Sequence, residues 1–107
     1  MSSPIHIDSL TDEFARELKK VLGRHLQEII LFGSRARGEA TAGSDYDFVV
    51  VVDDRRKEWE EVVLDKEVEM MNRYGALFVS LVHDRPGWER QQLTPLGQNI
   101  LREGVRV

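Results

Sequence analysis

The sequence predicts a small α/β domain in which a sheet of few strands is flanked by helices. Three short apolar runs rich in β-branched residues, 28–32, 46–52 and 76–82, are typical of buried strands. Longer segments with apolar residues at helical spacing precede, separate and follow these runs. The chain has 107 residues, of which 41% are hydrophobic and 32% charged. These values predict one globular domain over residues 1–107.

The N-terminal segment is expected to form a helix. Ser9 or Thr11 can act as its N-cap, because hydroxyl side chains accept hydrogen bonds from the free N–H groups of a first helical turn. The apolar residues that follow at helical spacing predict one buried stripe; they are Leu10, Phe14, Leu18, Val21 and Leu22. We expect this helix to end near residues 23–25.

The next segment predicts a strand that runs into a short helix. Residues 28–32 (EIILF) are apolar and partly β-branched, which is typical of a buried strand, and Gly33 bounds them. The segment SRARG that follows is long enough for about one or two helical turns. Ser34 is its expected N-cap and Gly38 its expected stop.

Residues 46–52 (YDFVVVV) give the strongest strand signal in the chain. Side chains alternate between the two faces of a strand, so the even-numbered residues of this run share one face. The odd-numbered residues share the other face with Asp45, and both faces are apolar beyond the two acids. We therefore expect a central strand that is covered on both sides.

The C-terminal half predicts more helices and a third strand. Apolar residues at helical spacing favour a long helix over residues 55–74, which Gly75 ends. Residues 76–82 (ALFVSLV) follow as a strand, and GWERQQ can form a turn of helix. A last helix is expected to begin at Thr94 and to end at Gly104. The predicted order is therefore α-β-α-β-α-β-α.

Two features of these C-terminal segments bear on partners. The acidic residues of the long helix are expected to form its solvated face; they are Glu58, Glu60, Glu61, Asp65, Glu67 and Glu69. The large residues of the same region either belong to the core or form an exposed interface patch; they are Trp59, Met70, Met71, Tyr74 and Trp88.

Composition and charge narrow the function classes. The net charge of −4 argues against a protein that binds nucleic acid directly. The chain has no cysteine, which excludes disulfides and thiolate metal sites. It has no apolar stretch near 18 residues and no signal-peptide pattern in MSSPIHIDSL. We therefore expect a cytoplasmic protein that does not bind a membrane.

Two acids stand at the start of the central strand. Asp45 and Asp47 are two residues apart and point the same way, with Cα atoms about 6.6 Å apart. Two carboxylates at this spacing repel each other, and a divalent cation between them removes the repulsion. Oxygen ligands alone suit Mg²⁺ or Mn²⁺. The alternative is an Asx turn at Asp45 and a solvated strand end at Asp47.

A second candidate feature is the glycine-serine turn after the first strand. The start of a helix leaves backbone N–H groups free at a positive dipole end, and Gly33 before Ser34 permits close approach of a phosphate. Arg35 and Arg37 either neutralise phosphate or lie in solvent, and of the two we favour Arg37. The alternative for Gly33 and Ser34 is an ordinary turn.

The two features together resemble a known signature. Gly33-Ser34, ten residues, and Asp45-Tyr46-Asp47 are similar to the G-S-x10-D-x-D motif of the DNA polymerase β-like nucleotidyltransferase superfamily. Within this superfamily, GSRARGEATAGSDYDFVVVV resembles the minimal nucleotidyltransferases (MNT). The element order and the closing ILREGVRV are also similar to those proteins.

The resemblance implies a fold, a site and a partner. The fold would be a small mixed sheet of three strands, or four, flanked by helices. Asp45 and Asp47 would ligate Mg²⁺, and Gly33 and Ser34 would hold the triphosphate of ATP. We assign Arg37 and Ser44 as further nucleotide-binding residues. The enzyme would transfer a nucleoside monophosphate, AMP from ATP, to a hydroxyl and release pyrophosphate.

Many minimal members of the superfamily resemble antitoxins that inactivate a HEPN-type ribonuclease toxin, by adenylylation of a tyrosine or by direct binding. A chain of 107 residues has no room for an additional acceptor-binding domain. The resemblance therefore implies a separate protein as acceptor, and an oligomer is compatible with it.

This sequence departs from the superfamily at the third carboxylate, which catalytic members carry on the following strand. Ser80 is the polar residue inside that run, at the place where the acid is expected, and a hydroxyl is a poor replacement at a divalent metal. Asp84 lies four residues further on the same face. The departure leaves open a catalytically weak or inactive module that neutralises its partner by direct binding.

Overall fold

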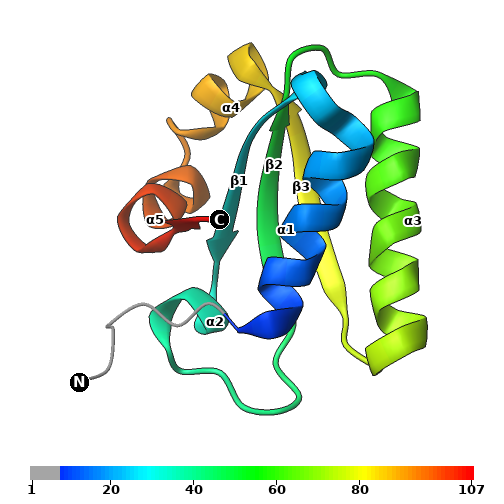
Figure 1. Ribbon diagram of the computed structural model, residues 1–107. Coiled ribbons are helices and arrows are strands. Elements are labelled where there is room, and N and C mark those ends of the chain that lie inside the picture. Colours follow the sequence, from blue (N-terminus) through cyan, green and yellow to red (C-terminus); the bar gives the residue numbers. More distant parts are fainter. Residues whose placement is uncertain (1–7) are drawn as a thin grey trace.

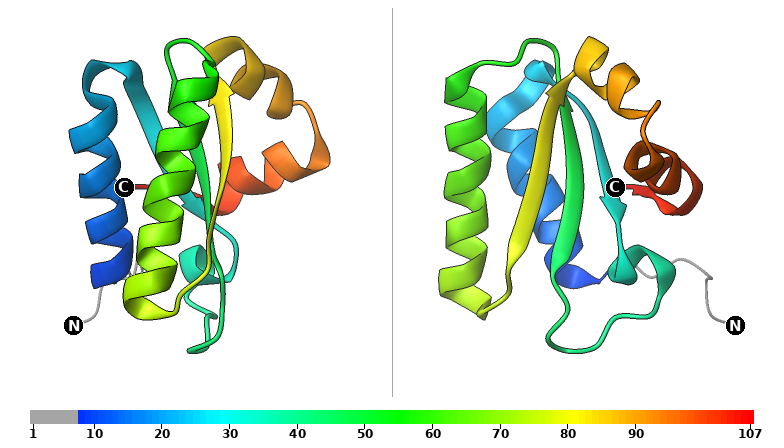
Figure 2. Two further views of the ribbon diagram at one scale, coloured as in Figure 1. Left: turned by 90° about the vertical axis from the view of Figure 1, so that its right-hand side faces the viewer. Right: turned by 180° about the vertical axis from the view of Figure 1, so that it is seen from behind.

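A four-stranded mixed sheet with helices on both faces forms the molecule (Figures 1 and 2). The computed structural model describes residues 8–107. Residues 1–7, which belong to the segment MSSPIHIDSL considered for a signal peptide, lie outside the described residues. The elements, in chain order, are α1 (Ser9–Leu22), a 3-10 turn (Gly23–His25), β1 (Leu26–Phe32), α2 (Ser34–Arg37), β2 (Tyr46–Val52), α3 (Lys57–Tyr74), β3 (Phe78–Asp84), α4 (Arg85–Gln91), α5 (Pro95–Glu103) and β4 (Val105–Arg106). The predicted α/β class is confirmed, with β4 as a fourth strand.

The strands lie in the order β3-β2-β1-β4. β1 is antiparallel to both β2 and β4, whereas β2 and β3 are parallel. A parallel pair needs a crossover connection, which α3 supplies between β2 and β3. The expected mixed sheet is thus observed, and β2 lies inside it as predicted.

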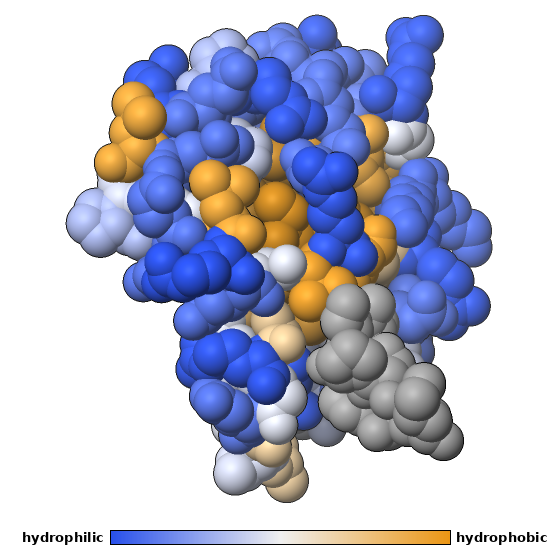
Figure 3. Space-filling model, turned by 90° about the vertical axis from the view of Figure 1, so that its left-hand side faces the viewer, coloured by the Kyte–Doolittle hydropathy of each residue, from blue (hydrophilic) through white to orange (hydrophobic). Residues whose placement is uncertain are grey.

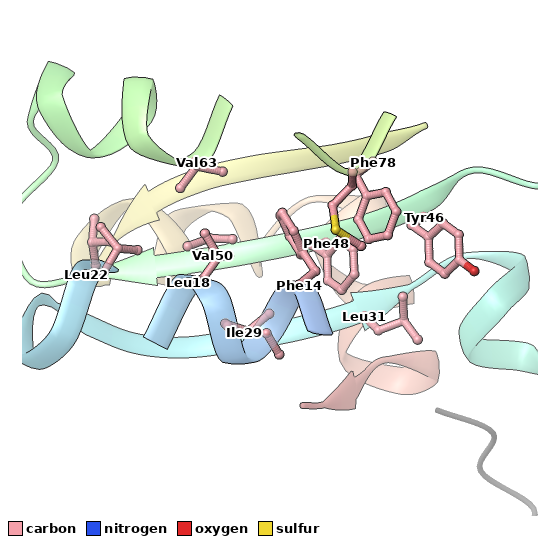
Figure 4. Close-up of a cluster of buried hydrophobic side chains, with 13 residues drawn as sticks. Phe14, Leu18, Leu22, Ile29, Leu31, Tyr46, Phe48, Val50, Val63 and Phe78 are labelled. Atoms are coloured by element: carbon pink, nitrogen blue, oxygen red, sulfur yellow. The ribbon is translucent and has the colours of Figure 1, made fainter. Parts of the chain in front are cut away.

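Both faces of β2 are buried, as the apolar run predicts. One face packs against α1 and α3, and the other packs against α4 and α5 (Figure 2). The Phe14 ring of α1 is tilted against the rings of Phe48 and Phe78, with 4.9 Å between ring centres in each pair, and Figure 4 shows these rings at the centre of the first layer. Trp88 of α4 is buried in the second layer, so it belongs to the core and not to an interface patch.

Two helix starts differ from the sequence prediction. The N-cap of α1 is Asp8, not Ser9 or Thr11: its Oδ1 accepts a hydrogen bond from the backbone N–H of Thr11 at 2.9 Å. A carboxylate at this position also favours the positive end of the helix. The N-cap of α2 is Gly33, so Ser34 is its first helical residue. The chain leaves β1 through a positive φ of 80° at Gly33, which suits glycine and moves the helix start one residue earlier.

The ends of the remaining helices follow the sequence signals. By contrast, β1 begins two residues earlier than predicted, α3 begins two residues later, and β3 covers Phe78–Asp84 instead of 76–82. Gly38 and Gly75 end α2 and α3 in the left-handed conformation, and Thr94 caps α5. Asp84 caps α4 by accepting a hydrogen bond from the N–H of Gly87 at 2.8 Å. In the part of the chain that the structure describes, no helix combines the length and the apolar character that a membrane span requires.

Candidate active site

The two acids lie at the mouth of β2, where its N-terminal end meets β1. Asp47 pairs with Phe32, the last residue of β1, and Asp45 directly precedes the strand. Asp47 is half-buried and Asp45 is exposed. Burial, and then the charge of Asp45, raise the pKa of the Asp47 carboxyl. The two ionised acids therefore disfavour each other, and a cation placed between them would stabilise both.

Gly33 brings the turn after β1 into direct contact with this acid. A Cβ atom built on Gly33 would lie 2.7 Å from Oδ2 of Asp47, which is closer than van der Waals contact allows. The backbone of Gly33 also has φ 80° and ψ −160°, a conformation that is essentially restricted to glycine. Glycine is therefore needed here for space and for backbone conformation, and the turn touches the carboxylate.

The residues present fit a divalent cation shared with a phosphate. Within residues 8–107, no group of three or more His, Asp or Glu side chains is placed to hold a metal. Asp45 and Asp47 are therefore the candidate protein ligands. Two carboxylates are sufficient, because Mg²⁺ is commonly bound by one or two carboxylates together with phosphate oxygens and water. The N–H groups of Ala36 and Arg37 donate to the Gly33 carbonyl. The N–H groups of Ser34 and Arg35, at the start of α2, are therefore the ones that could bind an anion.

Arg35 anchors the loop that leads into the acids. Its Nη2 and Nε donate to the carbonyl oxygen of Ser44 at 2.9 and 3.3 Å, and Nη2 also donates to that of Thr41 at 3.3 Å. Its guanidinium lies 3.9 Å from the centre of the Tyr46 ring. Arg35 therefore holds the backbone before Asp45 and contacts the Tyr46 side chain after it.

Tyr46 and Asp8 extend this network. The Tyr46 hydroxyl points out of the core cluster (Figure 4) and donates to Oδ2 of Asp8 at 2.6 Å. Burial, and then this hydrogen bond, raise the pKa of Tyr46 to about 12. Oδ2 of Asp8 also lies 3.5 Å from Nη1 of Arg35. Sequence reasoning missed this network of Asp8, Arg35 and Tyr46. The sequence gives only an indirect signal for it, namely an Arg on the turn together with a Tyr between the two acids.

In the structure, the side chains of Arg37 and Ser44 have partners of their own. Arg37 forms ion pairs with Glu39 at 2.8 Å and with Glu103 of α5 at 3.0 Å. Hydrogen bonds to these two carboxylates raise the pKa of Arg37. The Ser44 hydroxyl accepts a hydrogen bond from the backbone N–H of Thr41 at 2.9 Å, so it closes the turn before the acids.

The structure does not bring Ser80 or Asp84 to the acids. Asp47 pairs with Val79 in the parallel register, so Ser80 points to the opposite face, where α3 packs. Asp84 pairs with Val52 at the far end of β2, five positions from Asp47, and caps α4. The expectation that β3 supplies a third acidic or polar group at this site is therefore not met by either residue.

Known proteins share sequence similarity with most of this chain. Residues 11–94 match the family model described as a nucleotidyltransferase domain. Two inferred protein adenylyltransferases of Methanocaldococcus jannaschii are similar to the chain. MJ1305 is 33% identical over 98 residues, which cover 89% of this chain and 67% of that protein. MJ0604 is 30% identical over 92 residues, which cover 86% of this chain and 88% of that protein.

Solved structures share the fold at low sequence identity. A toxin–antitoxin crystallised with AMP-PNP has a TM-score of 0.64 at 20% identity, over 89% of this chain and 70% of that one. A variant of the toxin–antitoxin MntA–HpeT has a TM-score of 0.63 at 20% identity, over 95% of this chain and 72% of that one. At this identity the likeness establishes the fold.

Proposed function

Because the chain belongs to the nucleotidyltransferase domain family and has relatives named as protein adenylyltransferases, we propose that it transfers AMP from ATP to a hydroxyl group of a protein partner. We further propose that Mg²⁺, or Mn²⁺, is required and that the partner is the HEPN-type toxin of a toxin–antitoxin pair. The toxin–antitoxin structures with the same fold, one of them with AMP-PNP, support the nucleotide and the partner.

One observation carries this proposal: the Gly33 turn lies against the Asp47 carboxylate. A triphosphate held at the turn would thereby lie beside the two acids. In the proposed roles, Asp45 and Asp47 hold the cation, and Gly33 and Ser34 hold phosphate through their backbone. Arg37 and Ser44 are proposed as further nucleotide contacts, for which Arg37 must exchange Glu39 or Glu103 for a phosphate.

The proposed reaction exchanges a phosphoanhydride bond of ATP for a phosphoester bond to the acceptor. The acceptor oxygen bonds to the α-phosphorus of ATP, the bond from that phosphorus to the β-phosphate oxygen breaks, and pyrophosphate leaves with its electron pair. The acceptor hydroxyl loses its proton to solvent. A bound Mg²⁺ supplies charge neutralisation for the phosphates. This chain's own residues orient the triphosphate at Gly33 and hold Asp47 half-buried beside it.

A second function is favoured by a different observation. The described residues of β3 bring no third carboxylate to the acids. A protein that keeps the fold without this acid can neutralise its partner by occlusion alone. The alternative is therefore a catalytically weak or inactive antitoxin that acts through direct binding.

Transfer of label from ATP to the partner separates the two functions. The protein is incubated with α-labelled ATP, Mg²⁺ and the product of the adjacent reading frame, beside an Asp45→Ala/Asp47→Ala variant. Label on the partner that disappears with the variant supports the transferase. Protection of the partner without label, and equally by the variant, overturns the transferase and supports occlusion.

A further inference from the structure

The long outer edge of the sheet is open at β3, the strand beside α3 (Figure 1). The N–H of Tyr46 donates to the carbonyl of Leu77 at 2.9 Å, and Tyr46 pairs with Phe78. In a parallel ladder this register directs the odd-numbered residues of β3 toward β2. Ser80 and Val82 therefore direct their N–H and C=O groups away from the sheet. Among residues 8–107, no other strand pairs with this edge.

The opposite edge of the sheet differs from this one. It is formed by β4, which has two residues, and Figure 3 shows that side of the molecule. Long open edges are unusual because they invite pairing with other chains, and proteins normally shorten, charge or cover them. β3 has seven residues, so its edge is long enough to pair with another extended segment.

α3 projects beyond β3 and forms one wall of a groove along this edge (Figure 2). The groove has a volume of about 360 Å³ and is lined by α3 side chains, among them Leu64 and Glu67, and by Ser80 and Val82 of β3. Leu64 is 56% exposed, and Val68, one turn further on α3, is 48% exposed. The groove thus has strand backbone on one wall. The other wall carries both apolar and acidic side chains of α3, and Arg55 also lines the groove.

Glu67 of α3 is half-buried, whereas Glu61, Asp65 and Glu69 of the same helix are exposed. Its Oε2 and the Oγ of Ser80 are both buried, and neither has a hydrogen-bond partner within the described residues. Burial raises the pKa of Glu67, and the hydroxyl and backbone N–H of Ser80, which lie near this carboxylate, offset part of the effect. A buried carboxylate oxygen without a donor is unfavourable, so a cationic donor that enters the groove would be stabilised there.

We propose that an extended segment of a partner protein adds to β3 as a fifth strand under α3, with a Lys or Arg side chain that pairs with Glu67. A second copy of this chain fits less well, because its β3 carries no Lys or Arg and its own α3 projects over the same edge. The added strand would lie two strand spacings, about 10 Å, from β2, which carries Asp47. The identity of this partner as the nucleotide acceptor rests on the proposed function, whereas the docking does not.

A synthetic peptide tests the docking without any transfer reaction. The probe is an acetylated nine-residue peptide of alternating valine and threonine with one central lysine. One control has glutamate in place of the lysine, and a second is N-methylated at alternate residues so that it cannot donate main-chain hydrogen bonds. Amide hydrogen exchange, followed by NMR, and fluorescence anisotropy are measured on the full chain.

The lysine peptide should slow exchange of the Ser80 and Val82 amides at least fivefold, while the amides of Val79 and Leu81, already bonded to β2, stay unchanged. Glu67→Gln should weaken its binding at least fivefold, and Glu61→Gln, an exposed acid of the same helix, by less than twofold. Unchanged exchange at Ser80 and Val82 with millimolar lysine peptide overturns the proposal, as does equal binding of the N-methylated peptide. Failure of AMP transfer with this docking intact would overturn only the proposed function.

Discussion

Because Gly33 has no side chain, the turn after β1 can lie against the Asp47 carboxylate. The Asp47 carboxylate occupies the space that a Cβ atom would take. A substitution at Gly33 should therefore change both the conformation of the turn and the position of Asp47. The effect on stability can be measured without the transfer reaction.

Gly33→Ala should destabilise the protein by about 1–3 kcal/mol, because alanine disfavours φ 80° and ψ −160°. It should also reduce AMP transfer more than stability explains, because the new methyl group displaces Asp47. Gly43→Ala is the matched control: nothing lies within 4 Å of a Cβ at this position. Urea unfolding measures the stability of both variants, and the transfer assay measures their activity. Equal losses of stability and activity in the two variants would contradict a specific role for Gly33.

Asp47→Asn should raise the melting temperature at pH 7 without divalent cation, because burial and Asp45 raise the pKa of Asp47. For a carboxyl with a raised folded pKa, stability falls as the pH rises from the unfolded value of about 4 through the folded value. Water screens this half-buried group, so the gain should stay below about 1 kcal/mol, or a few degrees. Thermal unfolding should show a smaller difference at pH 4; the same difference at both pH values would refute the cause.

At the scale of elements, the four-residue helix α2 carries two arginines with different environments. Arg35 binds the loop backbone and the Tyr46 ring, whereas Arg37 forms ion pairs at the surface. One short helix thus points one guanidinium inward to hold the acid loop and the other outward, where it is accessible to a ligand.

Arg35→Ala should lower the free energy of unfolding by about 1–2 kcal/mol, through loss of hydrogen bonds to Ser44 and of the cation–π contact. Arg37→Ala should change stability by less than about 0.5 kcal/mol, because exposed ion pairs contribute little. It should weaken ATP binding severalfold, if the proposed phosphate contact holds. Urea denaturation of both variants measures the change in stability, and ATP titration measures the change in affinity. Destabilisation by Arg37→Ala but not by Arg35→Ala would contradict the structural role given to Arg35.

Element type and boundary were predictable where the local pattern is strong. Residues 46–52 form β2 as predicted, because an apolar run on both faces permits few alternatives. The position of Ser80 was not predictable, because its face depends on the register between β2 and β3. A shift of one residue between strands reverses every face, and that register is set by packing across the sheet, which no local pattern encodes.

At the scale of the molecule, helices cover both faces of the sheet and the candidate site lies at one end of it. α4 and α5 cover one face with Trp88 and Ile100, and α1 and α3 cover the other. The acids lie at the end of β2 where the loop after α2 enters, while Asp84 and α4 lie at the opposite end. The G-S and D-x-D residues were predicted to lie together because both flank neighbouring strands, whereas the Asp8–Tyr46 contact, 38 residues apart, depends on the tertiary fold.

Mg²⁺ with ATP should raise the melting temperature by several degrees at millimolar concentrations, because a ligand that binds only the folded state stabilises it. The Asp45→Ala/Asp47→Ala variant should show no such shift. Differential scanning fluorimetry with Mg²⁺ alone, ATP alone and both provides the measurement. No shift for the unaltered protein at millimolar ligand would argue against a nucleotide site.

The contact between Gly33 and Asp47 also has a thermodynamic consequence. A cation that orders Asp47 orders the neighbouring turn, so it prepares the surface on which a triphosphate would rest. Coupling of this kind is reciprocal: the factor by which the metal tightens nucleotide binding equals the factor by which the nucleotide tightens metal binding. The two affinities should therefore rise together, and a substitution at Gly33 should lower this coupling.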